Sequence, residues 1–266
     1  MEAPLTPEAV AERTGPTRIL REYRVFTELD STNTYLMERA RGEGEKEGLV
    51  VVAEYQTAGR GRQGRSWVAP PGSSIHCSVL LRPPLPAGEL YLLTAACALA
   101  VCDALAPLVQ ATPQLKWPND VLLEGRKVCG VLTESVLSGA VRPLAVVGFG
   151  VNVLSVPGPL HAPNAGCVAM YSAYPVTILD VLGATLAAYD ELLTDLYTRG
   201  GEGVWQAWRA GLTFGGRVQV RAETGTLEGV ALDVQRDGAL LVRGDDGVVR
   251  AVYAGEAVDR PSQSAG

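Results

Sequence analysis

The sequence predicts an α+β fold, with a mixed, largely antiparallel sheet and helices followed by a small β-barrel. Strand-like and helix-like segments are intermixed up to about residue 211, and the neighbouring strand-like segments over 114–153 favour antiparallel pairing. After Gly211 the sequence pattern changes to short β-like segments separated by glycine-containing turns, as in small barrels. The two patterns together predict a larger α+β domain and a smaller all-β domain.

Composition places the chain among ordinary globular proteins of one or two domains. It has 266 residues, of which 47% are hydrophobic and 20% charged, and its net charge is −6. The sequence pI of about 5.1 disfavours broad electrostatic attraction to nucleic acid. The N-terminus shows no signal-peptide pattern. We therefore expect neither a nucleic-acid partner nor a membrane partner.

Cysteine and histidine usage narrows the chemistry further. The five cysteines are odd in number and show no Cys-x-x-Cys spacing, so free thiols in a reducing cytosol are favoured over disulfides or a zinc site. The two histidines, His76 and His161, lie far apart in sequence, which disfavours a histidine-based metal centre or a serine–histidine triad. These residues predict a cytoplasmic protein.

The individual elements follow from apolar spacing and turn residues. Residues 1–20 are expected to be a loosely packed start, and Ser31 and Thr32 fit equally well as caps of the next helix and as ligand contacts. The apolar segment Leu90–Cys102 is shorter than the roughly 20 residues that a bilayer requires, so it predicts a buried helix. In chain order we expect strands at 49–55 and 74–82, a helix at 89–105, strands near 114–123, 127–137 and 143–153, with a hairpin turn at 124–126, a loop at 155–166, a helix at 176–199, and short strands at 217–222, 227–234, 239–243 and 248–253.

An arginine–glycine loop is the most informative segment. Residues 59–65 read Gly-Arg-Gly-Arg-Gln-Gly-Arg and directly follow the apolar segment 49–55. Glycine permits close backbone approach to a ligand, and arginine supplies a planar, permanently charged fork for carboxylate or phosphate. A disordered RNA-binding tail and a solvated loop are the alternatives. The position of the loop between ordered-looking segments favours an anion-binding site.

A second polar motif, Lys116-Trp117-Pro118-Asn119-Asp120, lies within the region expected to be a strand. An unpaired lysine is disfavoured in a strand core, and the Trp-Pro pair indicates an edge or a bulge. Lys116 is either an exposed edge residue that prevents aggregation or a cation directed into a pocket at a negatively charged centre. The sequence leaves both interpretations open.

Five motifs occur in an order that is typical of one enzyme family. They are Asp30-Ser31-Thr32-Asn33, Gln56-x-x-Gly59-Arg60-Gly61-Arg62-x-Gly64-Arg65, Lys116-Trp117-Pro118-Asn119-Asp120, Gly130-Val131-Leu132-x-Glu134 and Gly148-Phe149-Gly150-Val151-Asn152. From about residue 25 to the C-terminus the chain resembles biotin protein ligase, also called biotin–[acetyl-CoA carboxylase] ligase. The resemblance implies a lead segment at 1–24, an α+β catalytic domain of the biotin/lipoate ligase type at 25–212, and an SH3-like barrel at 213–266.

The resemblance implies an ATP-dependent, AMP-forming ligase. Biotin and ATP would give biotinyl-5′-AMP and pyrophosphate, and a lysine of a biotin carboxyl carrier protein would then take the biotinyl group. Mg²⁺ would accompany ATP, with ligands mostly from phosphate and water, and no protein ligand for it is assigned. Cations are required because the biotin carboxylate and the polyphosphate repel each other.

The same resemblance assigns site residues. Lys116, Arg60 and Arg62 are expected to be catalytic. Trp67 either packs on the ligand or closes a lid over it, and simple core packing explains this residue equally well. The expected biotin-binding residues are Ser31, Thr32, Asn33, Gln56, Gly59, Arg60, Gly61, Arg62 and Lys116. The expected ATP-binding residues are Arg62, Arg65, Trp67, Lys116, Asn119, Asn152 and Arg260. Asp120 either assists the acceptor lysine or forms structural hydrogen bonds.

Two rival functions and two further expectations complete the interpretation. A lipoate or octanoyl ligase would share the architecture but lack the arginine–glycine loop followed by Trp67, and a non-catalytic biotin sensor would bind biotin without forming the adenylate. Some relatives carry an N-terminal DNA-binding domain. About 29 residues precede Asp30 here, which predicts a monofunctional ligase without DNA binding. The strands near 143–153 could pair between subunits of a homodimer.

Overall fold

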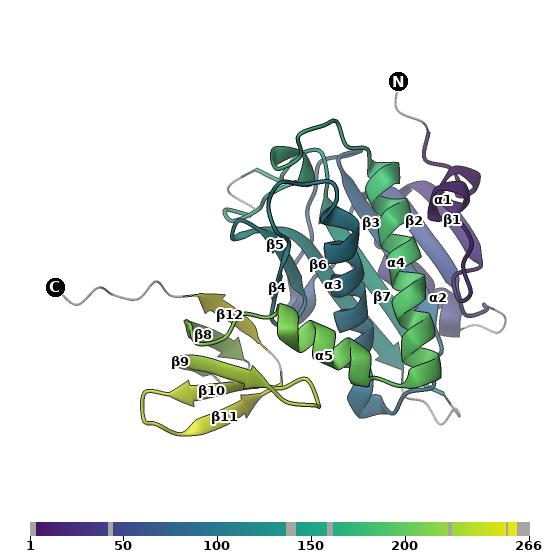
Figure 1. The fold of residues 1–266 in the computed structure, drawn as a ribbon. Helices are drawn as coiled ribbons and strands as arrows, with labels where there is room; N and C mark the ends of the chain where they lie inside the picture. Colours follow the sequence, from purple (N-terminus) through teal and green to yellow (C-terminus); the bar gives the residue numbers. More distant parts are fainter. Residues whose placement is uncertain are drawn as a thin grey trace.

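A seven-stranded sheet forms the centre of the larger domain (Figure 1). The computed structural model describes residues 4–41, 45–136, 142–158, 162–222, 225–253 and 255–259. The sheet order is β1-β2-β3-β7-β6-β5-β4, and the β1–β2 pair is parallel whereas the other pairs are antiparallel. The strands are β1 (Glu22–Leu29), β2 (Leu49–Gln56), β3 (Ser74–Leu81), β4 (Gln114–Lys116), β5 (Asp120–Leu123), β6 (Arg126–Val136) and β7 (Leu144–Asn152).

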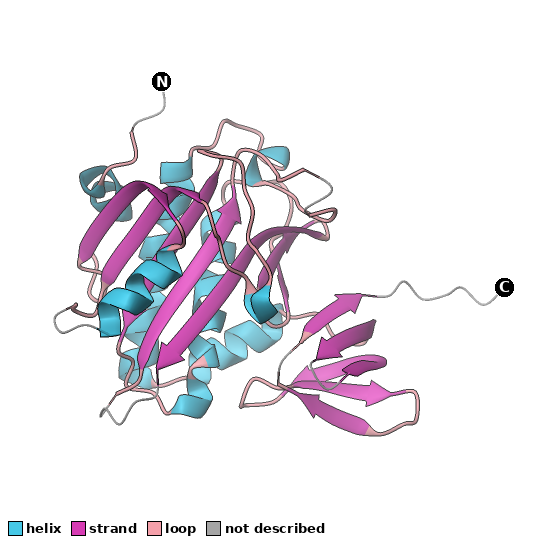
Figure 2. Cartoon of the chain, turned by 180° about the vertical axis from the view of Figure 1, so that it is seen from behind, coloured by secondary structure: helices cyan, strands magenta, loops and turns pink. Residues whose placement is uncertain are grey.

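The two faces of this sheet are covered differently. Helices α3 and α4 pack on one face, and the shorter α2 packs on the other (Figures 1 and 2). Strand alternation sends Ile75 and Cys77 into the α3–α4 core, so His76 and Ser78 point to the α2 face. The helices are α1 (Pro7–Thr14), α2 (Thr32–Arg41), α3 (Tyr91–Leu105), α4 (Ile178–Arg199) and α5 (Glu202–Gly211).

Helix α3 is apolar on all sides because other elements surround it. It contacts α4, α5 and several strands, and ten of its fifteen residues are buried. The segment Ala87–Leu105 has the length and hydropathy of a membrane span, but 61% of it is buried inside the protein, as in the core helix of a globular domain. The prediction of a buried helix at 89–105 is confirmed.

The N-terminal segment is packed, contrary to the expectation of a loose start. Helix α1 begins after Thr6, whose hydroxyl accepts a hydrogen bond from the Ala9 amide, and it lies against α4. Buried Asp190 of α4 accepts hydrogen bonds from the amides of Arg18, Ile19 and Leu20 at 2.7–2.8 Å. Apolar spacing could not reveal this anchor because its two parts are 170–172 residues apart.

The C-terminal domain is a five-stranded antiparallel sheet with the order β11-β10-β9-β8-β12. It is held to the larger domain by hydrogen bonds from Trp117 Nε1 to the Gly238 carbonyl (3.1 Å) and from Tyr91 Oη to the Arg236 carbonyl (2.7 Å). In the described residues the strand order is linear and does not close into a barrel. Its strands are β8 (Arg217–Ala222), β9 (Gly225–Val234), β10 (Leu240–Gly244), β11 (Val249–Val252) and β12 (Glu256–Asp259).

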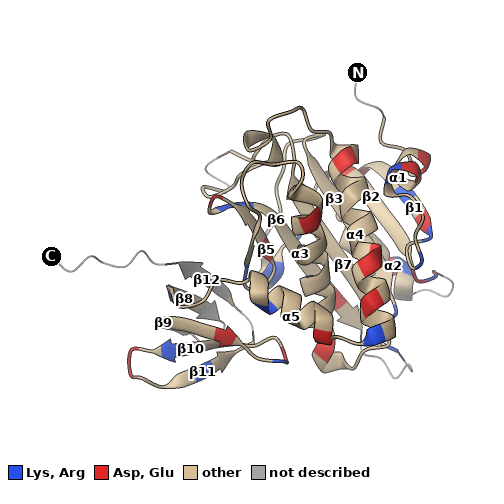
Figure 3. Cartoon of the chain, viewed as in Figure 1, with Lys and Arg blue, Asp and Glu red and all other residues tan. Residues whose placement is uncertain are grey.

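The α+β class is confirmed, and the differences are local. Strand β1, helix α5 and strand β12 were not predicted, and the single strand expected at 114–123 is a hairpin of β4 and β5. The expected turn at 124–126 is present, with Glu124 and Gly125 at positive φ. Lys and Arg positions are scattered among Asp and Glu positions along the described ribbon (Figure 3).

Replacing Asp190 tests the anchor of the N-terminal segment. We expect Asp190→Ala to lower the free energy of unfolding by roughly 3 kcal/mol, because it leaves three backbone donors without their acceptor. Urea denaturation measures the change. Asp195→Ala on the same helix is the control, since Asp195 is exposed and forms only a surface ion pair with Arg199. Equal stability of the two variants would show that the anchor contributes nothing.

Candidate active site

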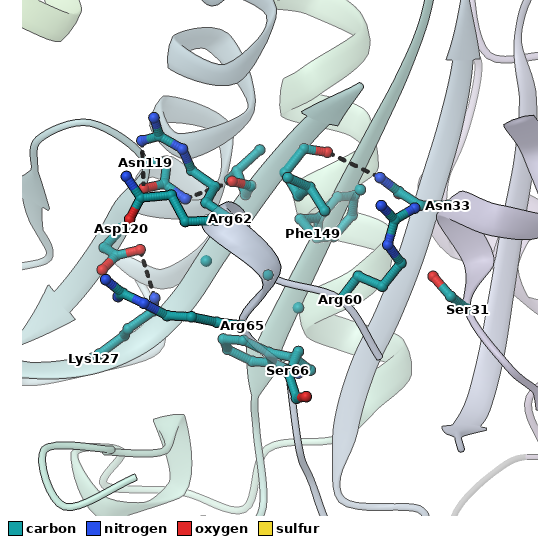
Figure 4. A pocket seen from close by; sticks show the side chains of 18 of the residues that line it. Ser31, Asn33, Arg60, Arg62, Arg65, Ser66, Asn119, Asp120, Lys127 and Phe149 are labelled. Atoms are coloured by element: carbon teal, nitrogen blue, oxygen red, sulfur yellow. Dashed lines mark hydrogen bonds and ion pairs between the residues drawn. The ribbon is translucent and has the colours of Figure 1, made fainter. Parts of the chain in front are cut away.

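A cavity of about 120 Å³ opens on the α2 face of the large sheet. The N-terminus of α2, the arginine–glycine loop, the β4–β5 turn and the middle of β6 and β7 all contribute to its lining. Figure 4 shows Arg60 on the side of Ser31 and Asn33, while Arg62 and Arg65 lie on the side of Asn119, Asp120 and Lys127. The cavity therefore brings together residues of all five sequence motifs, together with Lys127.

Glycines form the floor of this cavity. Gly150 of β7 pairs with Gly130 of β6, and Gly148 lies two residues before Gly150 on β7. A Cβ atom at Gly150 would lie 2.5 Å from the Trp67 ring, and one at Gly148 would collide with Asn33. The missing side chains leave room for Trp67 and Asn33 to lie directly against the sheet. This explains the Gly-Phe-Gly sequence in an otherwise apolar strand.

The arginine–glycine loop is a tight hairpin. The Gly61 amide donates to the Arg65 carbonyl (2.7 Å), the Trp67 amide donates to the Gly59 carbonyl (2.9 Å), and Arg60 and Ser66 form a β-bridge. A Cβ atom at Gly59 would lie 2.4 Å from the Trp67 carbonyl oxygen, so this hairpin requires glycine there. The loop is ordered within the domain, and the alternative of a disordered tail is wrong.

The arginines of the loop have different surroundings. Arg60 is exposed and forms an ion pair with Glu134 of β6 at 3.0 Å. Arg62 is half-buried and donates a hydrogen bond to Asn119 Oδ1 at 3.4 Å. Burial lowers the pKa of the Arg62 guanidinium, and the neighbouring Asp120 carboxylate opposes this shift. A half-buried guanidinium without a close carboxylate bond is suited to bind an anionic ligand.

The lysine that lines this cavity is Lys127, not Lys116. Its Nζ lies 2.7 Å from the Asp120 carboxylate and 5.7 Å from the centroid of the Trp67 ring, which is a cation–π geometry. Simple alternation along β6 would direct Lys127 away from Gly130 and Leu132. A register shift in the β5–β6 pairing, an irregularity of the β-bulge type, reverses this direction. Sequence reasoning therefore missed Lys127.

The expectation that Lys116 points into the same pocket as the loop is corrected by the structure. Leu115 and Trp117 are both buried in the core, so Lys116 between them points to the other side of the strand. It lines a separate depression at the C-terminal domain, together with Leu212 and Phe214. The cavity lined by Arg60 and Arg62 does not include Lys116.

Neutral polar groups line the end of the cavity beside α2. Gln56 Oε1 accepts hydrogen bonds from the Thr32 amide (2.7 Å) and hydroxyl (3.1 Å). Ser78, which was not predicted as a site residue, contacts both Thr32 Oγ1 (2.7 Å) and Asn33 Oδ1 (2.6 Å). Asn33 Nδ2 donates to Glu134, the partner of Arg60. Ser31 and Thr32 lie at the start of α2 and line the cavity, a position compatible with either expected role.

Most of the residues selected from the sequence meet in this cavity. Those that line it are Ser31, Thr32, Asn33, Gln56, Arg60, Gly61, Arg62, Arg65, Trp67 and Asn119. Gly59 does not line the cavity, but it permits the close approach of the Trp67 carbonyl within the loop. Asn152 is buried beside the cavity, where its amide donates to the Gly166 carbonyl (3.1 Å) and receives a hydrogen bond from Ser74 (3.5 Å). Arg260 lies outside the described residues.

This arrangement suits two anionic groups and one neutral polar group. Arg60, Arg62, Arg65 and Lys127 provide fixed positive charge, and the α2 end provides hydroxyls and amides without net charge. Among the described residues no group of three or more His, Cys, Asp or Glu side chains forms a metal site. The charge of the cavity lining therefore suits organic anions.

Comparison with known proteins agrees with this chemistry. The sequence profile of the biotin/lipoate A/B protein ligase family matches residues 25–152, and that of the biotin protein ligase C-terminal domain matches residues 213–258. The biotin–[acetyl-CoA-carboxylase] ligase of Paracoccus denitrificans is 36% identical over 235 residues, covering 82% of this chain and 92% of that protein. The chain belongs to the biotin/lipoate protein ligase family.

Other family members show the same extent of similarity. The biotin–[acetyl-CoA-carboxylase] ligase of Mycobacterium tuberculosis is 34% identical, covering 83% of this chain and 82% of that protein. The structure of biotin protein ligase from Aquifex aeolicus in complex with biotin and ATP matches with a TM-score of 0.75 and 28% identity, covering 90% of this chain and 99% of that one. The family similarity thus extends over both domains.

The role of the glycine floor is tested by adding one methyl group. We expect Gly150→Ala to displace the Trp67 ring and to lower the free energy of unfolding by ~1–3 kcal/mol, since the new Cβ would lie 2.5 Å from the ring. Urea denaturation and a crystal structure measure the two effects. Gly158→Ala is the matched control, because a Cβ there has no neighbour within 4 Å. An unmoved Trp67 in a fully stable variant would contradict this account of the floor.

Proposed function

We propose that this protein is a biotin–[acetyl-CoA-carboxylase] ligase. It activates biotin with ATP and transfers the biotinyl group to a lysine of a biotin carboxyl carrier protein. The observation that carries the proposal is the cavity in which Arg60, Arg62, Arg65 and Lys127 lie beside the neutral polar end at α2. The similarity to ligases of this name and to a ligase structure with biotin and ATP supports the same assignment.

The first half-reaction joins two anions. A carboxylate oxygen of biotin attacks the α-phosphorus of ATP, the new P–O bond gives biotinyl-5′-AMP, and the bond to the bridging oxygen breaks to release pyrophosphate. Positive groups must offset the repulsion between the reactants and the charge that develops at phosphorus. In this proposal Arg60 and Arg62 hold the carboxylate and α-phosphate region, and Lys127 takes the role that the sequence assigned to Lys116.

The second half-reaction requires an uncharged amine. The acceptor lysine attacks the carbonyl carbon of the mixed anhydride, its nitrogen loses one proton to solvent as the amide forms, and AMP leaves with the electron pair of the broken C–O bond. Lys127 again offsets the charge on the leaving phosphate. Asp120, paired with Lys127 at 2.7 Å, keeps that ammonium directed toward the cavity. Asp120 thus positions Lys127, in addition to any contact with the acceptor.

ATP enters this reaction as its Mg²⁺ complex, so the metal ion is part of the substrate. The described residues offer no cluster of three metal-ligating side chains, and phosphate and water oxygens are the ligands that Mg²⁺ prefers beside a nucleotide. The metal offsets charge on the leaving pyrophosphate. A ureido ring is held at the α2 end, where Thr32, Gln56 and Ser31 offer hydroxyl and amide groups.

Three finer expectations remain predictions. A cytoplasmic location follows from the free cysteines, all five of which are unpaired. A homodimer would use the strands near 143–153, and the absence of DNA binding rests on the acidic composition. The lipoate ligase alternative is disfavoured by the hydrogen-bonding groups at the α2 end, because a lipoyl ring has no urea to bind there.

Two lysine variants test whether the catalytic lysine is Lys116, as the sequence motifs suggest, or Lys127, as the cavity geometry suggests. We expect Lys127→Ala to reduce biotin-dependent adenylate formation by at least about 10²-fold, because a charge-stabilising group is lost from the reaction centre. Lys116→Ala should stay within about threefold of the wild type, since Lys116 faces another depression. Pyrophosphate release measures both, with circular dichroism as the check on folding. The reverse pattern would restore Lys116 as the catalytic lysine.

The proposed function itself is tested with ATP, Mg²⁺, a carrier domain and either biotin or lipoate. We expect the mass of the carrier domain to increase by one biotinyl group only with biotin and ATP. A gain with lipoate instead would indicate the rival ligase. Binding of biotin without adenylate or carrier modification would indicate a sensor, and either result would overturn the proposal.

A further inference from the structure

His76 lies next to the α2 end of the cavity, although no motif includes it. It is in the middle of β3, opposite Ala53 of β2 and Gly150 of β7, and only 2% of its surface is exposed. Its Nδ1 lies 3.3 Å from Gln56 Nε2. Its Nε2 is buried and has no hydrogen-bond partner in the described part of the chain. Among the described residues, the His76 ring therefore forms its side-chain hydrogen bond with Gln56 through Nδ1.

The proton positions in this contact follow from the neighbours. Gln56 Oε1 faces two donors of Thr32, so the amide nitrogen of Gln56 is the group that faces His76. An amide nitrogen can only donate, so His76 Nδ1 accepts and its proton resides on Nε2. Burial lowers the pKa of His76 to about 4, which keeps the ring neutral and Nδ1 free to accept at neutral pH.

The orientation of the Gln56 amide matters because Gln56 lines the cavity. With its oxygen engaged by Thr32 and one N–H engaged by His76, the second N–H is the group available to a ligand. A reversed amide would turn its nitrogen toward the Thr32 amide, would present an acceptor to the ligand and would require the other tautomer of His76. With its proton on Nε2, His76 supports the observed orientation on the side away from Thr32.

We propose that His76 is a positioning and specificity residue, which fixes the Gln56 amide so that the cavity presents a hydrogen-bond donor to the carbonyl of a cyclic urea. The proposal rests on the proposed function, since it assigns the ureido ring of biotin to this end of the cavity. A buried site that donates to a carbonyl discriminates strongly against a ligand without one. The His76–Gln56 contact thereby favours biotin over lipoate.

The direct test is steady-state kinetics of biotin-dependent pyrophosphate exchange. We expect His76→Phe, which removes the acceptor but keeps a ring, to raise the KM for biotin about fivefold to tenfold and to leave the KM for ATP unchanged. His76→Asn, which retains an acceptor, should recover part of the affinity. In a Gln56→Leu background His76→Phe should have no further effect. Equal shifts in both KM values, or additive effects, would overturn the proposal.

Tyr189→Phe is the matched control for the loss of one buried polar contact. Tyr189 is fully buried on the opposite face of the sheet, where its hydroxyl donates to the Leu93 carbonyl at 3.2 Å. This variant should lose stability without any change in the KM for biotin. An increase in that KM comparable with the increase in His76→Phe would mean that loss of packing, and not the Gln56 contact, explains the result.

Nuclear magnetic resonance of the wild-type chain provides a test that needs no variant. Only two histidines are present, so the ¹⁵N signals of His76 are readily assigned. We expect an unprotonated Nδ1 and a protonated Nε2 at neutral pH. The opposite tautomer would overturn the proposal while leaving the ligase activity, and hence the proposed function, intact. Inactive wild-type protein with the expected tautomer would instead count against the proposed function alone.

Discussion

Repulsion between two anionic reactants is the constraint on which this site depends. A carboxylate cannot approach a polyphosphate unless fixed positive charge is already present, and flexible surface lysines would provide it poorly. The chain meets this demand in an acidic protein by concentrating Arg60, Arg62, Arg65 and Lys127 around one cavity. Arg60 pairs with Glu134 and Lys127 pairs with Asp120, and both carboxylates belong to the sheet.

The sheet determines where these charges are placed. Gly130 and Gly150 leave a shallow floor, Trp67 lies on it, and the short hairpin before Trp67 holds the arginines above the same strands. A β-bulge then directs Lys127 to this side. Each feature is a local departure from regular strand sequence. Together they place the charged cavity on the less well covered face of the sheet, while α3 and α4 form the core on the other face.

The fold class and most elements could be predicted because apolar spacing is a local signal. Long helices such as α4 and hairpins such as β5–β6 are predicted by the spacing of apolar and turn residues within a short segment. The cavity residues that lie in contiguous motifs, including Arg60 and Arg62, could likewise be predicted from the sequence. Lys127 was not, because a register shift changes the face of a strand without a clear sequence signature. Asp190 and His76 were missed because their partners are distant in sequence, and only the folded chain brings each pair together.

The central claim concerns which groups surround the reacting phosphate, and a crystal structure with biotinyl-5′-AMP tests it directly. The account predicts that Lys127 Nζ lies within hydrogen-bond distance of the phosphate, with Arg62 on the same group and the ureido ring beside Gln56. A bound adenylate whose phosphate contacts Lys116, or one that lies away from the glycine floor, would contradict the account.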